Sequence, residues 1–140
     1  MHHLVYLSSS AYTFSEADLR HILTTSRKNN IQRNITGILL YHDGSILQVL
    51  EGEKLEIYEL YLKIMKDERH GGIVKLIDEE IDARDFADWS MGFRNLSSKE
   101  WENLSGFVNL HDKKHFMQEL ASKSLEVLTM IKTFMIVNVR

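Results

Sequence analysis

The feature that most constrains the fold of this chain is an Asp-Gly pair between two short apolar runs. The runs span residues 35–41 and 46–50, and His42-Asp43-Gly44-Ser45 separates them. Asp and Gly both tolerate a positive φ, which the tight turn between two antiparallel strands requires. The two runs are therefore predicted to form a β-hairpin.

Further elements are predicted on both sides of this hairpin. Residues 3–8 form a short apolar strand in which Leu4 and Tyr6 share one face and Val5 and Leu7 the other. A helix is predicted to begin with the capping motif at Ser15 and to end at Asn29-Asn30, with Leu19, Ile22, Leu23 and Ser26 on one face.

The second half of the pattern repeats this alternation. A helix is predicted from about residue 54 to 67, ending by Gly71-Gly72, with Ile57, Tyr61, Ile64 and Met65 on one face. Residues 73–81 and 88–96 are predicted as the fourth and fifth strands. This order predicts an α+β ferredoxin-like sandwich, a five-stranded mixed sheet with two helices on one face.

The rest of the chain has a helical character. Apolar residues recur at helical spacing in the last part of the chain, at Phe116, Leu120, Val127, Ile131 and Phe134. We expect this stripe to bury itself on the free face of the sheet. Because 140 residues suit one domain, we expect a core over 1–96 and a helical extension over 97–140 within one domain.

Composition excludes several classes of site. The chain has no cysteine, which removes disulfides, thiolate metal sites and thiol nucleophiles. Its net charge of −3 lacks the basic excess typical of nucleic-acid binding.

The seven histidines form no HExxH motif and no carboxylate–histidine cluster in the sequence, so no metal site is expected. No signal peptide or long apolar span is visible, so a cytoplasmic protein without membrane contact is expected.

Two polar residues stand within apolar strands. Gln48 lies inside Ile46-Leu47-Gln48-Val49-Leu50, and Tyr6 lies in the first strand. An unpaired buried amide costs on the order of 1–3 kcal/mol, so Gln48 needs partners. If the first and third strands are neighbours, Tyr6 and Gln48 are expected to partner each other. Both residues fit either a satisfied core pair or a site that grips a flat polar ligand.

Other candidates also have structural explanations. Asn29-Asn30 fits a helix C-cap as well as a ligand site, and Asp67-Glu68-Arg69-His70 fits a solvated helix end. Trp89 and Met91 on a strand face are typical of core residues. Taken singly, these residues support a small-ligand site only weakly.

Taken together, they occur in six motifs in colinear order over residues 3–96. The motifs are LVYLS at 4–8, SRKNN at 26–30, ITGIL at 35–39, ILQVLEG at 46–52, DERH at 67–70 and DWSMG at 88–92. This series resembles the BLUF family, blue-light sensors that bind FAD, and the length is similar to that of its short, stand-alone members.

The resemblance implies a role for each motif residue. Tyr6 matches the photoactive tyrosine and Gln48 the glutamine that bridges it to the flavin, while Trp89 and Met91 match a mobile pair on the fifth strand. The flavin is expected between the two main helices and the sheet. The residues expected to bind the flavin are Tyr6, Ser26, Asn29, Asn30, Gln48, Asp67, Arg69 and His70.

The resemblance also implies a mechanism. Light-driven electron and proton transfer from Tyr6 lets Gln48 rearrange its hydrogen bonds to the flavin, which gives a reversible red shift and alters protein–protein contacts. FAD is the expected cofactor, with FMN or riboflavin as alternatives. A homo-oligomer and a separate downstream protein are the expected partners, and no enzymatic activity is expected. The alternatives are a dark flavin-binding enzyme, a small ferredoxin-like hydrolase and a cofactor-free interaction module.

Overall fold

The fold is built on one five-stranded sheet. The computed structural model of the chain describes residues 1–87, 92–95 and 125–138. Its elements, in chain order, are β1 (His2–Ser10), α1 (Glu16–Arg33), β2 (Thr36–His42), β3 (Ser45–Gly52), α2 (Lys54–Met65), β4 (His70–Glu80), β5 (Gly92–Asn95) and α4 (Leu125–Asn138). The strand order is β4-β1-β3-β2-β5, with β5 parallel to β2 and the other pairs antiparallel.

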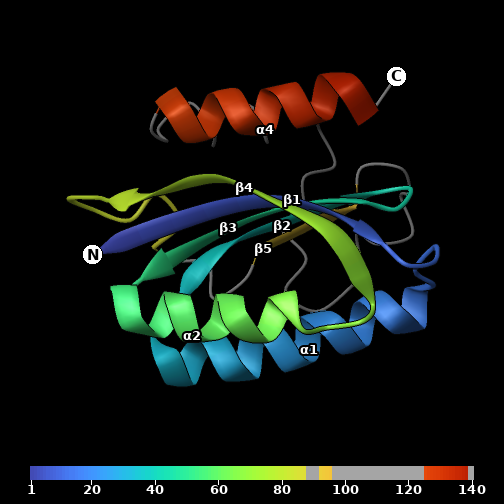
Figure 1. The fold of residues 1–140 in the computed structure, drawn as a ribbon, viewed down its shortest axis with the longest axis horizontal. Coiled ribbons are helices and arrows are strands. Elements are labelled where there is room, and N and C mark those ends of the chain that lie inside the picture. The colour runs from blue at the N-terminus through green and yellow to red at the C-terminus, as the bar shows by residue number, and fades with distance from the viewer. Residues whose placement is uncertain (88–91, 96–124, 139–140) are drawn as a thin grey trace.

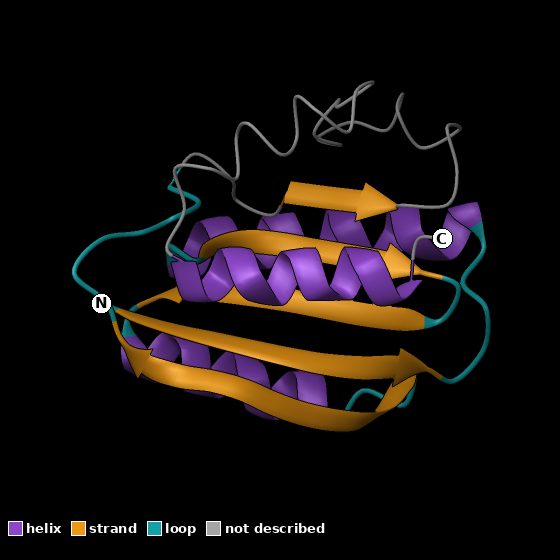
Figure 2. Ribbon diagram, turned by 90° about the horizontal axis from the view of Figure 1, so that it is seen from above, coloured by secondary structure: helices purple, strands orange, loops and turns teal. Residues whose placement is uncertain are grey.

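Helices cover both faces of this sheet. Helices α1 and α2 lie on one face and α4 lies on the other (Figure 1), and the strands run between these layers (Figure 2). Two buried apolar clusters fill the two interfaces. The cluster under α1 and α2 includes Leu4, Leu19 and Ile57, and the cluster under α4 includes Val5 and Val127. The predicted α+β sandwich, with its mixed five-stranded sheet, is confirmed.

The predicted hairpin joins β2 and β3. Asp43 and Gly44 have φ values of 48° and 93°, and the flanking residues His42 and Ser45 pair directly. Two successive positive φ values are those of the turn whose twist matches a pair of antiparallel strands. The Asp-Gly pair therefore acts as the sequence predicts.

Helix α1 begins as predicted and ends later. The side chain of Ser15 accepts a hydrogen bond from the Asp18 N–H at 3.1 Å, and Asp18 accepts one from the Ser15 N–H at 2.9 Å. The predicted end at Asn29-Asn30 is wrong, because the helix continues to Arg33 and its C-cap is Asn34 in the left-handed region at φ 54°. Asparagine tolerates that conformation, and the Asn34 N–H bonds the Asn30 carbonyl.

Two further expectations for α2 and β4 are corrected. Gly71 and Gly72 do not form the end of a helix: α2 ends at Met65, and both glycines lie in β4, where Gly71 pairs with Ser9 beside a register shift. Gly72 has a φ of 60°, which glycine adopts without strain. Met65 is 54% exposed, so it is not part of the buried face of α2.

The C-terminal stripe is confirmed where it is described. Val127, Ile131 and Phe134 of α4 are buried in the cluster on the second face of the sheet. Phe116 and Leu120, like Trp89 and Met91, lie outside the described residues. In the parts of the chain that are described, no helix combines the length and apolar character that crossing a bilayer requires.

Gly37 marks a close approach between β2 and β3. A Cβ atom at this position would lie 1.8 Å from the Val49 carbonyl oxygen and 2.9 Å from its carbon. These are backbone atoms of a central strand, so they have no flexible side chain that can move away. The sheet therefore requires glycine here.

We expect Gly37→Ala to lower the free energy of unfolding by about 3 kcal/mol, at the upper end of overpacking costs. Urea denaturation measures this change. Gly71→Ala is the matched control, since a Cβ there meets nothing within 4 Å, and it should change stability by less than about 0.5 kcal/mol. Equal stability of the two variants would contradict the close approach.

Candidate functional site

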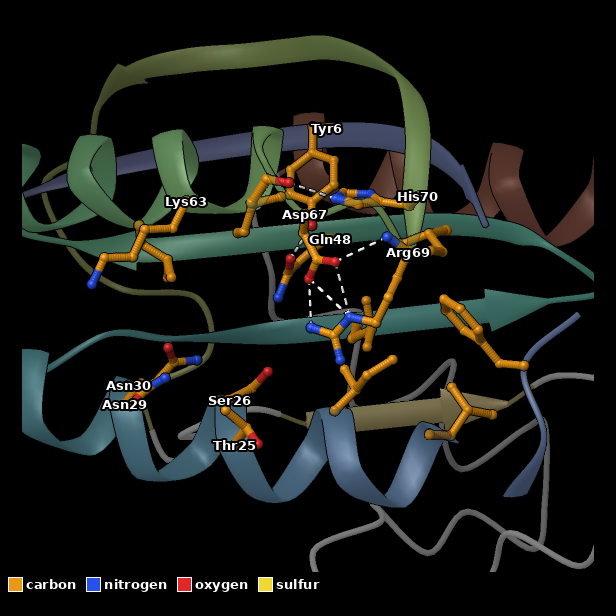
Figure 3. A pocket seen from close by; sticks show the side chains of 17 residues that line it. Tyr6, Thr25, Ser26, Asn29, Asn30, Gln48, Lys63, Asp67, Arg69 and His70 are labelled. Atoms are coloured by element: carbon orange, nitrogen blue, oxygen red, sulfur yellow. Dashed lines mark hydrogen bonds and ion pairs between the residues drawn. The ribbon is translucent and has the colours of Figure 1, made fainter. Parts of the chain in front are cut away.

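A cavity of about 200 Å³ lies between α1, α2 and the inner face of the sheet. Figure 3 shows its walls: Thr25, Ser26, Asn29 and Asn30 project from α1 on one side, and Tyr6 and Gln48 come from the sheet. The full lining consists of Tyr6, Phe14, Leu19, Ile22, Thr25, Ser26, Asn29, Asn30, Leu39, Ile46, Gln48, Leu60, Lys63, Ile64, Asp67, Arg69 and His70. Every flavin-binding residue expected from the sequence lines this one cavity.

Tyr6 and Gln48 form a buried pair on the sheet floor of the cavity. They are direct cross-strand partners in the antiparallel pairing of β1 with β3. The Tyr6 hydroxyl donates a hydrogen bond to Oε1 of Gln48, and the two residues are only 3% and 7% exposed. The partnership expected from neighbouring first and third strands is therefore present. Each residue satisfies a polar group that would be costly to bury alone.

The surroundings of Tyr6 keep its phenol protonated. Burial raises the pKa of the Tyr6 hydroxyl well above that of an exposed phenol, and Tyr61 and Asp67 raise it further. The Tyr61 ring lies 5.8 Å from the Tyr6 ring and the His70 ring lies 6.3 Å from it, measured between centroids. Tyr6 thus holds a proton at its hydroxyl oxygen and points it at the Gln48 carbonyl.

Helix α1 supplies an amide wall opposite the sheet. Asn30 is 2% exposed although it lies on a helix, and Ser26 and Asn29 line the cavity beside it. Residues three and four apart share a helix face, which is why Ser26 reaches the same cavity as the two asparagines. Because α1 continues past Asn30, this residue is held on a regular helical turn and is not a cap.

The loop after α2 and the first residue of β4 form a charged, hydrogen-bonded end of the cavity. Arg69 binds Asp67 through its Nε at 2.9 and 3.0 Å, and this contact lowers the pKa of the Asp67 carboxyl and raises that of the guanidinium. His70 Nε2 lies 2.7 Å from the Ile64 carbonyl oxygen, and His70 Nδ1 lies 2.9 Å from the Ser8 hydroxyl. A carbonyl only accepts, so Nε2 carries a proton and orients the ring.

Two polar residues of the lining are absent from the sequence-based set. Thr25 precedes Ser26 on α1, and Lys63 lies between the lining residues Leu60 and Ile64 on α2. Thr25 lies four positions before Asn29 on α1, so helical spacing indicates it, whereas no predicted site residue lies on α2 to indicate Lys63. Trp89 and Met91 lie outside the described residues, so their position relative to the cavity is not part of this geometry.

The fold also creates a histidine–carboxylate group that no local motif encodes. Ligand atoms of His3, Glu79 and Glu126 lie within 4.8 Å of one another. These residues come from β1, β4 and α4, so their separation in the sequence hides the group, and the expectation that the chain holds no metal site stays a prediction. His3 shares a strand face with Val5, so the group lies on the other side of the sheet from the cavity.

The chemistry of the cavity fits a flat cofactor with polar edges. Leucine and isoleucine side chains from α1, α2 and the sheet provide apolar surface, while the amides of Asn30 and Gln48 provide donors and acceptors at the same cavity. Lys63 and Arg69 add cationic groups. A ring system with carbonyl and nitrogen edges matches this set of donors.

The comparison with protein families agrees with this chemistry. Residues 1–92 match the family model described as BLUF, sensors of blue light using FAD. The chain belongs to the BLUF family. It is therefore a flavin-binding, blue-light-sensing domain, and the family resemblance seen in its motifs is confirmed.

Relatives of this BLUF domain are light-regulated proteins. It is 38% identical over 110 residues to photoactivated adenylate cyclase subunit beta of Euglena longa, covering 78% of this chain and 12% of the relative. It is similar to the structure of a bacterial light-regulated adenylyl cyclase, with a TM-score of 0.67, 35% identity, and coverage of 92% of this chain and 36% of the other. The chain thus spans only a small part of each cyclase.

A shorter relative matches nearly end to end. The dark-state structure of BlrB, a BLUF protein, has a TM-score of 0.67 and 31% identity, with 86% of this chain and 92% of that chain covered. The BLUF fold described here is therefore shared with a chain of similar extent.

The raised pKa of Tyr6 predicts a phenol that stays protonated under alkaline conditions. In the folded domain labelled with ¹³C at the tyrosine ring, the Tyr6 resonance should not shift at pH values where free tyrosine, with a pKa of about 10, ionises. Tyr6→Phe identifies the resonance. Ionisation of Tyr6 together with free tyrosine would contradict the buried environment described above.

Proposed function

We propose that this BLUF domain binds FAD non-covalently in the cavity between α1, α2 and the sheet, and that Tyr6 and Gln48 convert blue light into a rearranged hydrogen-bond network. The flavin ring fits between the amide wall of α1 and the sheet floor. The proposed binding residues are Tyr6, Ser26, Asn29, Asn30, Gln48, Asp67, Arg69 and His70.

The buried hydrogen bond from Tyr6 to Gln48 carries this proposal. A phenol and an amide within an apolar core are costly unless both are satisfied, and here they satisfy each other at the wall of the cavity. An amide has a donor end and an acceptor end, so Gln48 has two alternative arrangements in the same space. That two-way choice is what a reversible switch needs.

A bound flavin, when excited by blue light, is an oxidant strong enough to take an electron from a nearby phenol. Loss of an electron makes the Tyr6 hydroxyl strongly acidic, so its proton leaves along the existing hydrogen bond toward Gln48. The return of electron and proton leaves Gln48 with its amide rearranged and restores Tyr6. The new donor from Gln48 at the cavity wall then accounts for a red-shifted state.

The charged end of the cavity favours a flavin that carries phosphates. Arg69 is oriented by its contacts with Asp67, and the Lys63 side chain belongs to the same lining. Guanidinium and ammonium groups are the usual partners of phosphate oxygens. FAD is therefore preferred over riboflavin, and FMN is the nearest alternative.

The proposed output is a change in protein–protein contacts. We assign residues 1–96 to the sensor core and 97–140 to a helical extension, with Trp89 and Met91 as the mobile pair of the fifth strand predicted over 88–96. The extension includes α4, which packs on the second face of the sheet. The sensor itself performs no catalysis and acts on a second copy of the chain or on a separate effector.

Blue light should shift the flavin absorption band of the purified domain reversibly to the red. Gln48→Leu should keep the bound flavin and abolish the shift, because leucine cannot rearrange hydrogen bonds; Tyr6→Phe should also block the photocycle. Absorption spectra before and after illumination measure both effects. Identification of the released flavin by mass distinguishes FAD from FMN and riboflavin.

The matched control is Gln32→Leu, the same substitution at an exposed position of α1. It should retain the full red shift. A colourless protein that does not take up FAD, or a wild-type photocycle in Gln48→Leu, would contradict the proposal.

The proposed output predicts self-association that depends on light. Light scattering coupled to gel filtration should give a mass above the 16.4 kDa of one chain, and blue light should change the distribution. Gln48→Leu should keep its dark distribution under illumination. A monomer in both states would exclude the oligomer and leave a separate partner as the output.

A further inference from the structure

Glu51 is a buried carboxylate that the cavity does not use. It lies on β3 and is 0% exposed. Strand alternation places it on the same face as Leu47 and Val49, which belong to the cluster under α4, whereas Gln48 faces the cavity. A buried carboxylate is costly unless hydrogen bonds compensate it, so its partners indicate what the fold gains from it.

The partners of Glu51 are backbone groups of one short segment. Its carboxylate accepts hydrogen bonds from the Asp85 N–H at 2.6 Å and the Phe86 N–H at 2.9 Å, and from the Thr36 hydroxyl at 3.1 Å. Burial raises the pKa of the Glu51 carboxyl, and the two backbone N–H groups oppose that shift. The side chain thus fixes residues 85 and 86 to the end of β3.

The side chain of Arg84 also holds this segment in place. Its Nη1 donates to the Thr36 hydroxyl at 2.7 Å and to the Glu51 carbonyl at 3.0 Å, and its Nη2 donates to the Asn34 carbonyl at 2.6 Å. Asn34 is the C-cap of α1. Residues 84–86 are therefore tied to the end of α1, the start of β2 and the end of β3.

Phe86 extends this connection into the core under α4. Its side chain is 0% exposed and belongs to the same buried cluster as Val127, Ile131 and Phe134. Glu51 lies three positions after Gln48, a separation of about 10 Å along a strand. A shift of β3 at Gln48 therefore has a short, hydrogen-bonded path to an aromatic ring in the α4 interface.

We propose that Glu51 is a positioning residue for signal transmission: it couples the strand that carries Gln48 to Phe86 and, through Phe86, to α4. This inference rests on the proposed light-driven rearrangement of Gln48. Two successive backbone N–H groups donate directional hydrogen bonds to the buried carboxylate, so residues 85 and 86 move with β3. Phe86 then changes its packing against α4, which carries the change to the opposite face of the sheet.

The test separates the photochemistry from its transmission. Glu51→Gln keeps the size of the side chain but sets an NH₂ donor among N–H donors, which loosens the hold on residues 85 and 86. Two quantities are measured in the dark and under blue light: the red shift of the flavin band, and hydrogen exchange of peptides covering α4 (residues 125–138).

In the wild-type domain, illumination should change exchange across α4. In Glu51→Gln the red shift should remain, while the light-minus-dark difference in α4 exchange should fall at least five-fold. A purely structural role for Glu51 would raise exchange equally in dark and light and preserve the difference. Glu53→Gln, the same change at an exposed residue two positions further on, should behave as wild type.

Phe86→Leu tests the same path if Glu51→Gln fails to fold, since it leaves the carboxylate–backbone bonds in place and removes the ring. It too should keep the red shift and reduce the α4 response. A full α4 response in either folded variant, or no α4 response in the wild type despite a normal red shift, overturns the coupling. Absence of the red shift in the wild type instead overturns the proposed function.

Discussion

The antiparallel register of β1 with β3 is the constraint on which the rest of this domain depends. It sets Tyr6 opposite Gln48 on one face of the sheet and Val5 opposite Val49 on the other. A slip of one residue would move every side chain of β1 to the opposite face. The phenol would then lie in the apolar core under α4, and valine would lie at the cavity. The apolar faces of both strands hold this register.

The same register makes the polar pair both stable and changeable. Tyr6 and Gln48 satisfy each other where water is excluded, so neither leaves an unpaired polar group in the core. An amide nevertheless offers two ends of similar shape and opposite hydrogen-bonding character. A pair of charged residues would have one preferred arrangement and a larger desolvation cost. A neutral phenol and an amide are thus suited to a switch that must return to its starting state.

Local patterns predicted most of this fold, and long-range contacts account for what they missed. The Asp-Gly turn, the faces of β1 and the capping box at Ser15 each depend on neighbouring residues, and the structure has all three. The end of α1 was missed because an asparagine pair resembles a cap, while the actual cap, Asn34, is fixed by its own backbone conformation. The position of Gly71 and Gly72 within β4 could not be predicted from local patterns, because it depends on the pairing of β4 with β1.

The candidate site also has parts that local patterns predict and parts that only long-range contacts determine. The motifs identified most of the polar residues that line the cavity, though not Thr25 and Lys63, and strand pairing was enough to expect Tyr6 beside Gln48. The role of Glu51 was not predictable, because its partners Asp85 and Phe86 lie in a loop that no periodic pattern describes. Sequence patterns also say little about groups such as His3, Glu79 and Glu126, which three separate elements bring together.

The position of strand β3 determines how a change at the cavity can reach the opposite face of the sheet. Its alternate side chains face two different environments: Gln48 lines the cavity, and Glu51 lies toward the α4 side. The packed clusters on each face resist compression, so a local change is passed on as a displacement of the strand and is not absorbed by its neighbours. A backbone shared by both faces therefore connects the cavity to α4 without a continuous chain of side chains through the sheet. Because β3 is an interior strand, paired on one side with β1 and on the other with β2, such a displacement also involves the strand that carries Tyr6 and the strand that pairs with β5.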